Sequence, residues 1–131
     1  MNVLLDTHVW LWSLADESRL APAVRRLLAA GDTGIWLSPV SLWEALILAE
    51  RGRVDFGMDV DRWITAATTG IGIREAPLTF EIARESRRIR LGTEDPADRF
   101  LAATARLLDL TLVTADRRLL RSKAVATMKA A

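Results

Sequence analysis

Four acidic residues stand at positions where their side chains could act together in catalysis. Asp6 directly follows an apolar run at residues 3–5, and Asp116 lies just beyond a second apolar run at residues 110–113. Glu44 and Asp98 lie near the predicted starts of two helices. Carboxylates that converge repel one another, and their pKa values rise unless a cation lies among them. Carboxylate oxygens are ligands that Mg²⁺ and Mn²⁺ prefer, so these residues point to a site for one of these ions.

A carboxylate-bound Mg²⁺ or Mn²⁺ is suited to the hydrolysis of a phosphodiester bond. One or two such ions activate water, orient the phosphate and stabilise the leaving oxygen. The chain offers no convincing side-chain nucleophile for this reaction, because it has no cysteine and His8 is its single histidine. We interpret His8 as a structural residue or one that supports a ligand. The acids therefore predict a metal-dependent hydrolase.

Short apolar segments alternate with longer helical patterns along the chain. The segments have the length of strands and lie at residues 3–5, 35–37, 71–73 and 110–113. Strands joined by helices form a parallel sheet covered on both faces, so we predict an α/β fold, a three-layer α/β/α sandwich with a central, mainly parallel sheet. Open α/β sheets place their sites at the carboxyl ends of the strands, where Asp6 and Asp116 would meet. Asp98 joins them only if its helix begins at that edge.

Helix start and stop signals fill the intervals between the predicted strands. Each predicted helix begins at a capping residue or a proline, and most end near a glycine. The predicted helices run from Pro22 to Gly31, from Ser38 to Gly52, from Asp59 to Gly70, from Thr79 to Gly92 and from Asp95 to Leu108. The tail after residue 122 has no clear pattern and stays unassigned.

Most of these acids also have a purely structural explanation. The explanations are a capping box of Ser41 and Glu44, a favourable helix-dipole position for Asp98 after the N-cap Asp95, and an N-cap position for Asp116 before a short helix. We interpret Asp95 mainly as a cap. Asp6 is harder to explain in this way, since an acid directly after a buried strand is costly unless something pairs with it or binds it.

Length and composition favour a single domain over residues 1–131. Half of the residues are hydrophobic and 27% are charged, which is typical of a globular protein with a sizeable core. No apolar run approaches the roughly 18 residues that a membrane span requires. The lack of cysteine and of a secretory signal pattern favours a cytoplasmic location. The formal net charge of +1 does not by itself indicate nucleic-acid binding.

Two groups of side chains keep more than one interpretation. Arg84, Arg87 and Arg88 share a predicted helix face, and together with Arg90 they form either a solvated face or a patch that contacts phosphates. Most of the five tryptophans are expected in the core, although aromatic residues are also common in interfaces. Trp43 stands next to Glu44 and could line the groove of the site.

The segments that carry the acids resemble a known family. LLDTHVWLW, SLWEALIL, DPADRFLAATA and TLVTAD, in this order and at these separations, resemble the signature segments of the PIN-domain nucleases. They are most similar to the VapC-type toxins of bacterial type II toxin–antitoxin systems. The resemblance covers essentially the whole chain, and the ordered set is more specific than any one segment.

The resemblance implies a metal-dependent endoribonuclease that hydrolyses RNA. Asp6, Glu44, Asp98 and Asp116 would surround Mg²⁺ or Mn²⁺, with Asp6 and Asp98 as the principal ligands. Glu44 and Asp116 would complete the cluster directly or through water. Thr114 matches a hydroxyl position near the site, where it would support a ligand or contact the substrate. The family likeness also implies a homodimer and a small cognate antitoxin as partner, and it is the source of the preference for RNA over DNA.

Alternatives from other classes fit less well. A receiver-type phosphoacceptor domain would need an adjacent acidic pair and a lysine after the last strand, for which Lys123 is the nearest candidate. A phosphatase of the haloacid dehalogenase type would need a second aspartate at the position of His8. A non-catalytic PIN-like module that binds RNA or protein is the stronger alternative. It has no need for mutually repelling acids, which favours the enzyme.

Overall fold

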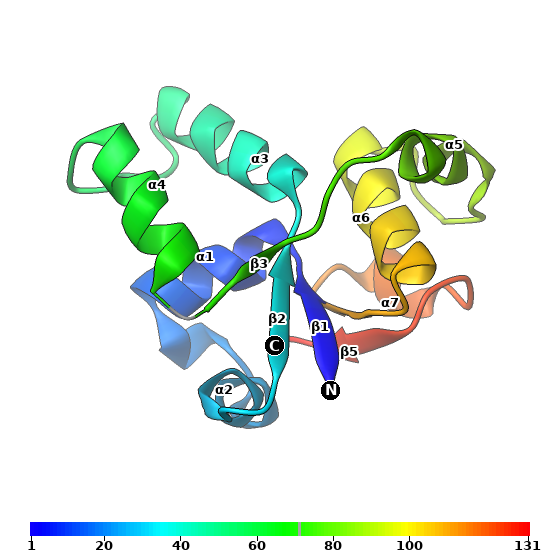
Figure 1. Cartoon of the computed structure of the whole chain (residues 1–131), viewed down its shortest axis with the longest axis horizontal. Helices are drawn as coiled ribbons and strands as arrows, with labels where there is room; N and C mark the ends of the chain where they lie inside the picture. The colour runs from blue at the N-terminus through cyan, green and yellow to red at the C-terminus, as the bar shows by residue number, and fades with distance from the viewer. Residues whose placement is uncertain (71) are drawn as a thin grey trace.

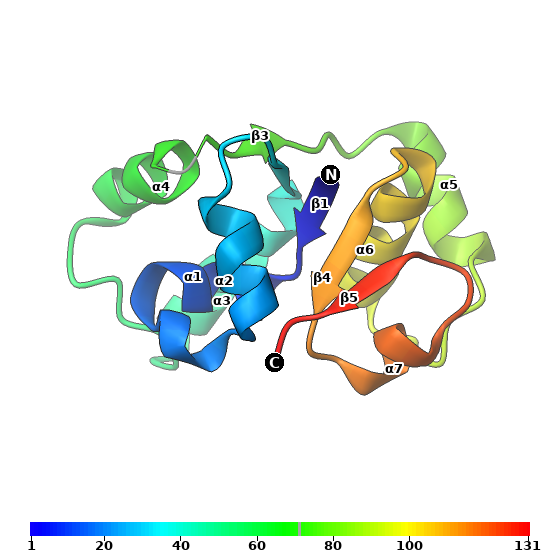
Figure 2. The ribbon, with the colours of Figure 1, turned by 90° about the horizontal axis from the view of Figure 1, so that it is seen from below.

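One five-stranded sheet separates two groups of helices in the computed structural model, which describes residues 1–70 and 72–131 (Figure 1). Helices α1, α2 and α4 lie on one side of the sheet and α5, α6 and α7 on the other (Figure 2). The strands are β1 (Asn2–Leu5), β2 (Gly34–Leu37), β3 (Arg74–Glu75), β4 (Thr111–Thr114) and β5 (Thr127–Lys129). The α-helices are α1 (Thr7–Ala15), α2 (Pro22–Ala29), α3 (Pro39–Glu50), α4 (Val60–Thr69), α5 (Phe80–Arg88), α6 (Pro96–Leu107) and α7 (Arg117–Arg121), and a 3-10 helix spans Glu17–Arg19.

The strand order is β3-β2-β1-β4-β5, and every pair is parallel. β1 is the central strand, and its Leu4 pairs with Trp36 of β2 and Leu112 of β4. All strands therefore end at the same edge, and β1 and β4 end beside each other. The prediction of a mainly parallel sheet within an α/β/α sandwich is confirmed.

The residues of β1 divide the core between the two faces of the sheet. Val3 and Leu5 belong to an apolar cluster with Trp10 and Trp63 on one face, whereas Leu4 belongs to a cluster with Leu101 on the other face. Val3, Leu4 and Leu5 are all fully buried. A strand covered on both faces has no solvated side, which explains its uninterrupted apolar sequence.

Two strands differ from the sequence prediction. The third strand is wrong as placed at residues 71–73: Gly72 and Ile73 lie outside any strand, β3 starts at Arg74, and Ile71 falls outside the described residues. β3 is an edge strand of two exposed residues, so it needs no apolar pattern, and Ile73 instead packs against the core from the preceding loop. The unassigned tail forms β5, which extends the sheet beside β4.

The helices follow the predicted caps closely, with two exceptions. Ser38, Asp59, Thr79, Asp95 and Asp116 all accept a backbone N–H at the start of their helices, as predicted. The sequence prediction did not include α1, which begins directly after Asp6. α5 ends at Arg88 instead of near Gly92, because the buried Ile89 takes an extended conformation.

None of the helices in the described residues is both long and apolar enough to cross a membrane.

Candidate active site

Asp6 is held at the carboxyl end of the central strand. Its backbone N–H donates to Val113 O at 3.0 Å, which extends the ladder between β1 and β4 by one residue. Its Oδ2 accepts from Thr114 Oγ1 at 2.6 Å, and its Oδ1 accepts from Thr7 N at 2.7 Å as the N-cap of α1. Both carboxylate oxygens are thereby oriented by donors from β4 and α1. The predicted supporting position of Thr114 agrees with this contact, since Thr114 is fully buried beside Asp6.

Glu44 reaches the same edge from the second turn of α3. Thr7 Oγ1 donates to Glu44 Oε1 and lies 3.0 Å from Ser41 Oγ. Ser41 is therefore not the cap of this helix, and the capping box of Ser41 and Glu44 is wrong: Ser38 caps α3 by accepting from Val40 N at 3.0 Å. Glu44 is free of the helix start and faces the strand ends.

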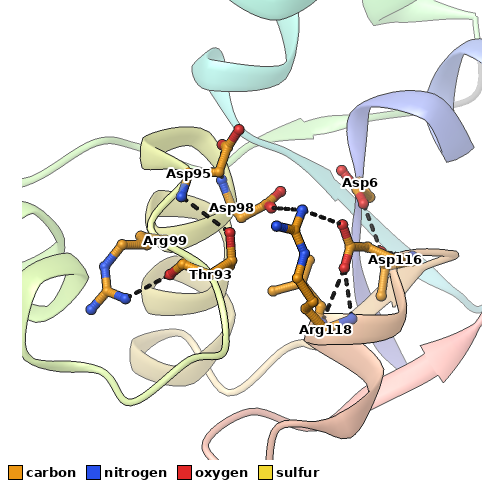
Figure 3. Close-up of polar contacts among 9 residues, drawn as sticks. Asp6, Thr93, Asp95, Asp98, Arg99, Asp116 and Arg118 are labelled. Atoms are coloured by element: carbon orange, nitrogen blue, oxygen red, sulfur yellow. Dashed lines mark hydrogen bonds and ion pairs between the residues drawn. The ribbon is translucent and has the colours of Figure 1, made fainter.

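Asp98 and Asp116 are linked by an arginine that the sequence analysis did not single out. Arg118 Nη2 lies 3.8 Å from Asp98 Oδ2 and 3.3 Å from Asp116 Oδ2, and Figure 3 shows the guanidinium between the two carboxylates. Asp98 projects from the first turn of α6, where Asp95 Oδ1 accepts its N–H at 3.1 Å. The start of α6 therefore lies at the carboxyl edge of the sheet, as the sequence prediction required.

These side chains line one cavity of about 350 Å³, which we call the acidic cavity. Its lining includes all four predicted acids, together with Asp95 and Arg118. His8 and Trp12 of α1 form part of its wall. The structure thus brings together four acids that are up to 110 positions apart in the sequence, from the ends of two strands and the first two turns of two helices.

The pKa values of three acids respond to this crowding. Burial, followed by the charges of Asp95, Asp6, Asp116 and Glu44, raises the pKa of Asp98 to about 7. Burial is also the main cause that raises the pKa of Asp6 and of Glu44, against the hydrogen bonds from Thr114 and Thr7 that lower them. A cavity that disfavours negative charge in this way is one that a cation would stabilise.

The pKa of Asp116 is shifted in the opposite direction. Although burial would raise it, the hydrogen bond from the Arg118 side chain and those from the N–H groups of Arg118 and Leu119 lower it. Asp116 is thus the carboxylate of the cluster that stays ionised most easily. It combines a helix-capping role with a place in the cavity.

Comparison with known proteins identifies the family of this chain. The model of the PIN domain family matches residues 3–125. The chain belongs to the PIN-domain family. Ribonuclease VapC22 of Mycobacterium tuberculosis is 32% identical to it over 119 residues, which are 90% of this chain and 89% of that protein.

Solved structures share the fold of this PIN domain at lower identity. VapBC2 from Rickettsia felis, bound to a DNA fragment from its promoter, aligns over 100% of both chains with a TM-score of 0.68 and 13% identity. DNA-bound VapBC from Salmonella typhimurium covers 98% of this chain and 97% of its own, with a TM-score of 0.64 and 17% identity.

The carboxylate oxygens of this PIN domain are suitable ligands for a hard divalent cation. Carboxylates on four separate elements, with raised pKa values at three of them, supply oxygen ligands and excess negative charge. Within residues 1–70 and 72–131, no three acidic side chains are close enough to hold one ion as they stand. Arg118 supplies positive charge between Asp98 and Asp116 instead.

Thr7 and Arg118 are the site residues that sequence reasoning missed. Thr7 follows Asp6 directly and is 2% exposed, but a hydroxyl next to an acid carries no signal of its own. Arg118 had a weak signal, because two arginines directly after Asp116 place at least one cation near the acid. Which acid it pairs with depends on the tertiary structure.

Proposed function

We propose that this PIN domain, residues 1–131, is an endoribonuclease that requires Mg²⁺ or Mn²⁺ and hydrolyses phosphodiester bonds in RNA. The observation that carries the proposal is the convergence of four carboxylates in one cavity at the end of the sheet. The relative with 32% identity bears the name of a ribonuclease, which supports the choice of reaction. We also propose a cytoplasmic location, where the protein would meet cellular RNA.

The residues of the cavity divide the work between binding an ion and keeping its ligands in place. Asp6 and Asp98 would be the principal ligands, and Glu44 and Asp116 would complete the set directly or through water. The ion would supply an activated water and stabilise charge on the phosphate. Thr114 and Thr7 fix the carboxylates of Asp6 and Glu44, so these ligands lose little freedom when an ion binds.

We also propose that the protein is the toxin of a toxin–antitoxin pair and forms a homodimer. The two solved structures described above, which share its fold, contain VapBC, and this supports an antitoxin as partner. The surface offers apolar side chains for protein contacts: Phe80 is 93% exposed and Trp43 is 57% exposed. Large exposed aromatic residues are frequent anchors of protein interfaces.

Cleavage of a mixed cellular RNA pool tests the proposed function. Purified protein free of antitoxin should cut RNA with Mg²⁺ or Mn²⁺ and stop when a chelator is added. Asp6→Asn keeps the shape and the N-cap of α1 but removes one charged ligand, so its cleavage should fall at least about a hundredfold. Cutting that persists in chelator would contradict the metal requirement. A folded protein that binds RNA but never cuts it would favour a non-catalytic binding module.

The affinity for Mn²⁺ should depend on pH because a proton competes with the ion at Asp98. The pKa of Asp98 is about 7, so the carboxyl is mostly protonated at about pH 6 and mostly ionised at about pH 8. Binding should therefore be about tenfold weaker at the lower pH. Calorimetric titration of the RNA-free protein with Mn²⁺ measures the ratio. Equal affinity at the two pH values would exclude Asp98 as a ligand whose proton must leave.

A further inference from the structure

A second and larger cavity adjoins the acidic one. It has a volume of about 840 Å³ and lies between the C-terminal ends of α5 and α6, the helix α7 and the segment after α7. Its lining includes six basic side chains and a single carboxylate, Glu85. The basic residues are Arg88, Arg90, Arg106, Arg118, Arg121 and Lys123. We call this cavity the basic cavity.

The basic cavity concentrates charge that the whole chain does not carry. Six cations and one carboxylate give its lining a formal charge of +5, whereas the entire chain has +1. Glu85 pairs with Arg106 at 3.8 Å. Arg118 pairs with Asp98 and Asp116 of the acidic cavity. In the part of the chain that the structure describes, no carboxylate forms an ion pair with the other four basic residues.

Helix dipoles explain only part of this cluster. Arg88 and Arg106 lie in the last turns of α5 and α6, where a cation is favourable whatever else it does. Arg90 and Lys123 belong to no helix and gain no such benefit. Ser122 Oγ donates to Arg90 O at 3.3 Å and ties together the two loops that carry them, which lie side by side in Figure 2. The fold thus holds unpaired cations together against their mutual repulsion, which a polyanion would relieve.

Arg118 connects the basic cavity with the acidic one. It lines both cavities, and its guanidinium lies between Asp98 and Asp116 (Figure 3). A strand whose cleaved phosphate lay among the carboxylates would therefore pass Arg118 and meet the remaining cations next. A single phosphate would use few of these cations, because they come from several elements around a cavity of 840 Å³.

We propose that the basic cavity binds the sugar–phosphate backbone of the RNA strand next to the bond that is cleaved. This inference rests on the proposed ribonuclease function and adds the path of the substrate. The members of the arginine cluster at residues 84–90 do not all line the basic cavity. Arg88 and Arg90 line it and would contact the backbone phosphates, whereas Arg87 pairs with Glu94 at 3.7 Å outside it.

A double variant in the basic cavity tests this path. Arg121→Gln with Lys123→Gln removes two exposed cations that form no ion pair within the described residues and lie outside the acid cluster. The matched control is Arg26→Gln with Arg62→Gln, which removes two exposed cations from α2 and α4 on the other side of the sheet. Binding of a labelled uridine oligonucleotide is measured by fluorescence anisotropy in chelator over a range of salt concentrations. Thermal unfolding of each variant verifies that it is folded.

The cavity variant should bind the oligonucleotide about tenfold more weakly at about 0.1 M salt, and its salt slope should be smaller by about 1.4, since each phosphate contact on a single strand contributes about 0.7. The control should keep the affinity and slope of the original protein. Unchanged binding by the cavity variant, or an equal loss in the control, would overturn the proposal.

Cleavage assays separate this proposal from the proposed function. In Mn²⁺ the cavity variant should show a raised KM with kcat within about twofold, because its acids are intact. Metal-dependent cutting with unchanged KM and affinity would reject the basic cavity and keep the nuclease. Binding that depends on the basic cavity in a protein that never cuts RNA would reject the nuclease and keep the basic cavity.

Discussion

Replacement of Asp98 by Asn should reduce metal-dependent RNA cleavage by about 10²–10³-fold. The change keeps the size of the side chain but removes a proposed principal ligand and one negative charge from the cavity. A bound ion contributes several kcal/mol to stabilisation of the transition state, and each 1.36 kcal/mol corresponds to a factor of ten in rate. Initial rates on a labelled RNA in Mg²⁺ and in Mn²⁺ measure the loss.

The matched control for this substitution is Asp109→Asn. Asp109 is exposed just after the other end of α6 and has a positive φ of 54°, a conformation that Asn adopts well. It lies outside the acidic cavity, so its variant should cut RNA at the original rate. Equal activities of the Asp98 variant and the original protein would remove Asp98 from the site.

The Asp98→Asn variant should also be more stable than the original protein when metal is removed. The pKa of Asp98 is about 7 in the folded protein and near 3.8 in the unfolded chain, so the folded state binds the extra proton between these values. The free energy of unfolding of the original protein therefore falls as the pH rises from about 4 to about 7, and this contribution is constant above that range. Asn has no such titration.

About 1–2 kcal/mol should separate the two proteins in chelator at about pH 8. The full shift would correspond to about 4 kcal/mol, but the carboxyl is partly solvated and Arg118 lies nearby, so we discount it. Urea unfolding at about pH 5 and pH 8 measures the difference. A variant that unfolds more easily than the original protein at both pH values would identify Asp98 as a structural residue of α6.

Arg99→Met should lower the free energy of unfolding by about 3–5 kcal/mol. Arg99 is only 5% exposed, and its guanidinium donates to three backbone carbonyls: Nε to Ser86 O at 2.7 Å, Nη1 to Thr93 O at 3.0 Å and Nη2 to Ile89 O at 2.6 Å. Methionine fills similar space but leaves these buried acceptors without their donors. The melting temperature in chelator should fall by roughly 10 °C or more.

Two further variants distinguish hydrogen bonding from charge at this position. Arg99→Lys keeps the charge but lacks the planar fork, so it should recover only part of the stability. Arg87→Met is the control, because the Arg87 side chain is 68% exposed and pairs with Glu94 only at the surface. It should change the free energy of unfolding by less than about 0.5 kcal/mol. An Arg99→Met protein as stable as this control would show that other donors satisfy the three carbonyls.

Arg99 matters for the site because of the segment that it holds. Its hydrogen bonds fix residues 89–93, and Thr93 Oγ1 accepts from Asp95 N at 3.1 Å (Figure 3). Asp95 in turn caps α6 and orients the turn that carries Asp98. Arg99 therefore acts as a positioning residue for Asp98, at a distance from the cavity.

The local sequence was sufficient for most elements that carry the acids. The apolar run before Asp6 predicted β1, and Ser38, Asp95 and Asp116 predicted the helix starts, because burial on two faces and capping are decided by neighbouring residues. The same rules failed where solvent or distant contacts decide. β3 is an exposed edge strand. α5 ends early, where Arg99 of α6 donates to the carbonyl of Ser86 near the end of α5 and to that of Ile89 just after it.

The sequence by itself determined the fold class, the order of most strands and helices, and which acids follow strands or lie near the starts of helices, because these features depend on periodicity and capping within a few residues. Only the tertiary structure decided three features of the site. Thr7 orients Glu44 and Thr114 orients Asp6. Arg118 lies between Asp98 and Asp116, and basic residues from three helices and two loops form a cavity beside the acids. These contacts join residues far apart in the chain. Their distances depend on the packing of whole helices across the sheet, which no local pattern encodes.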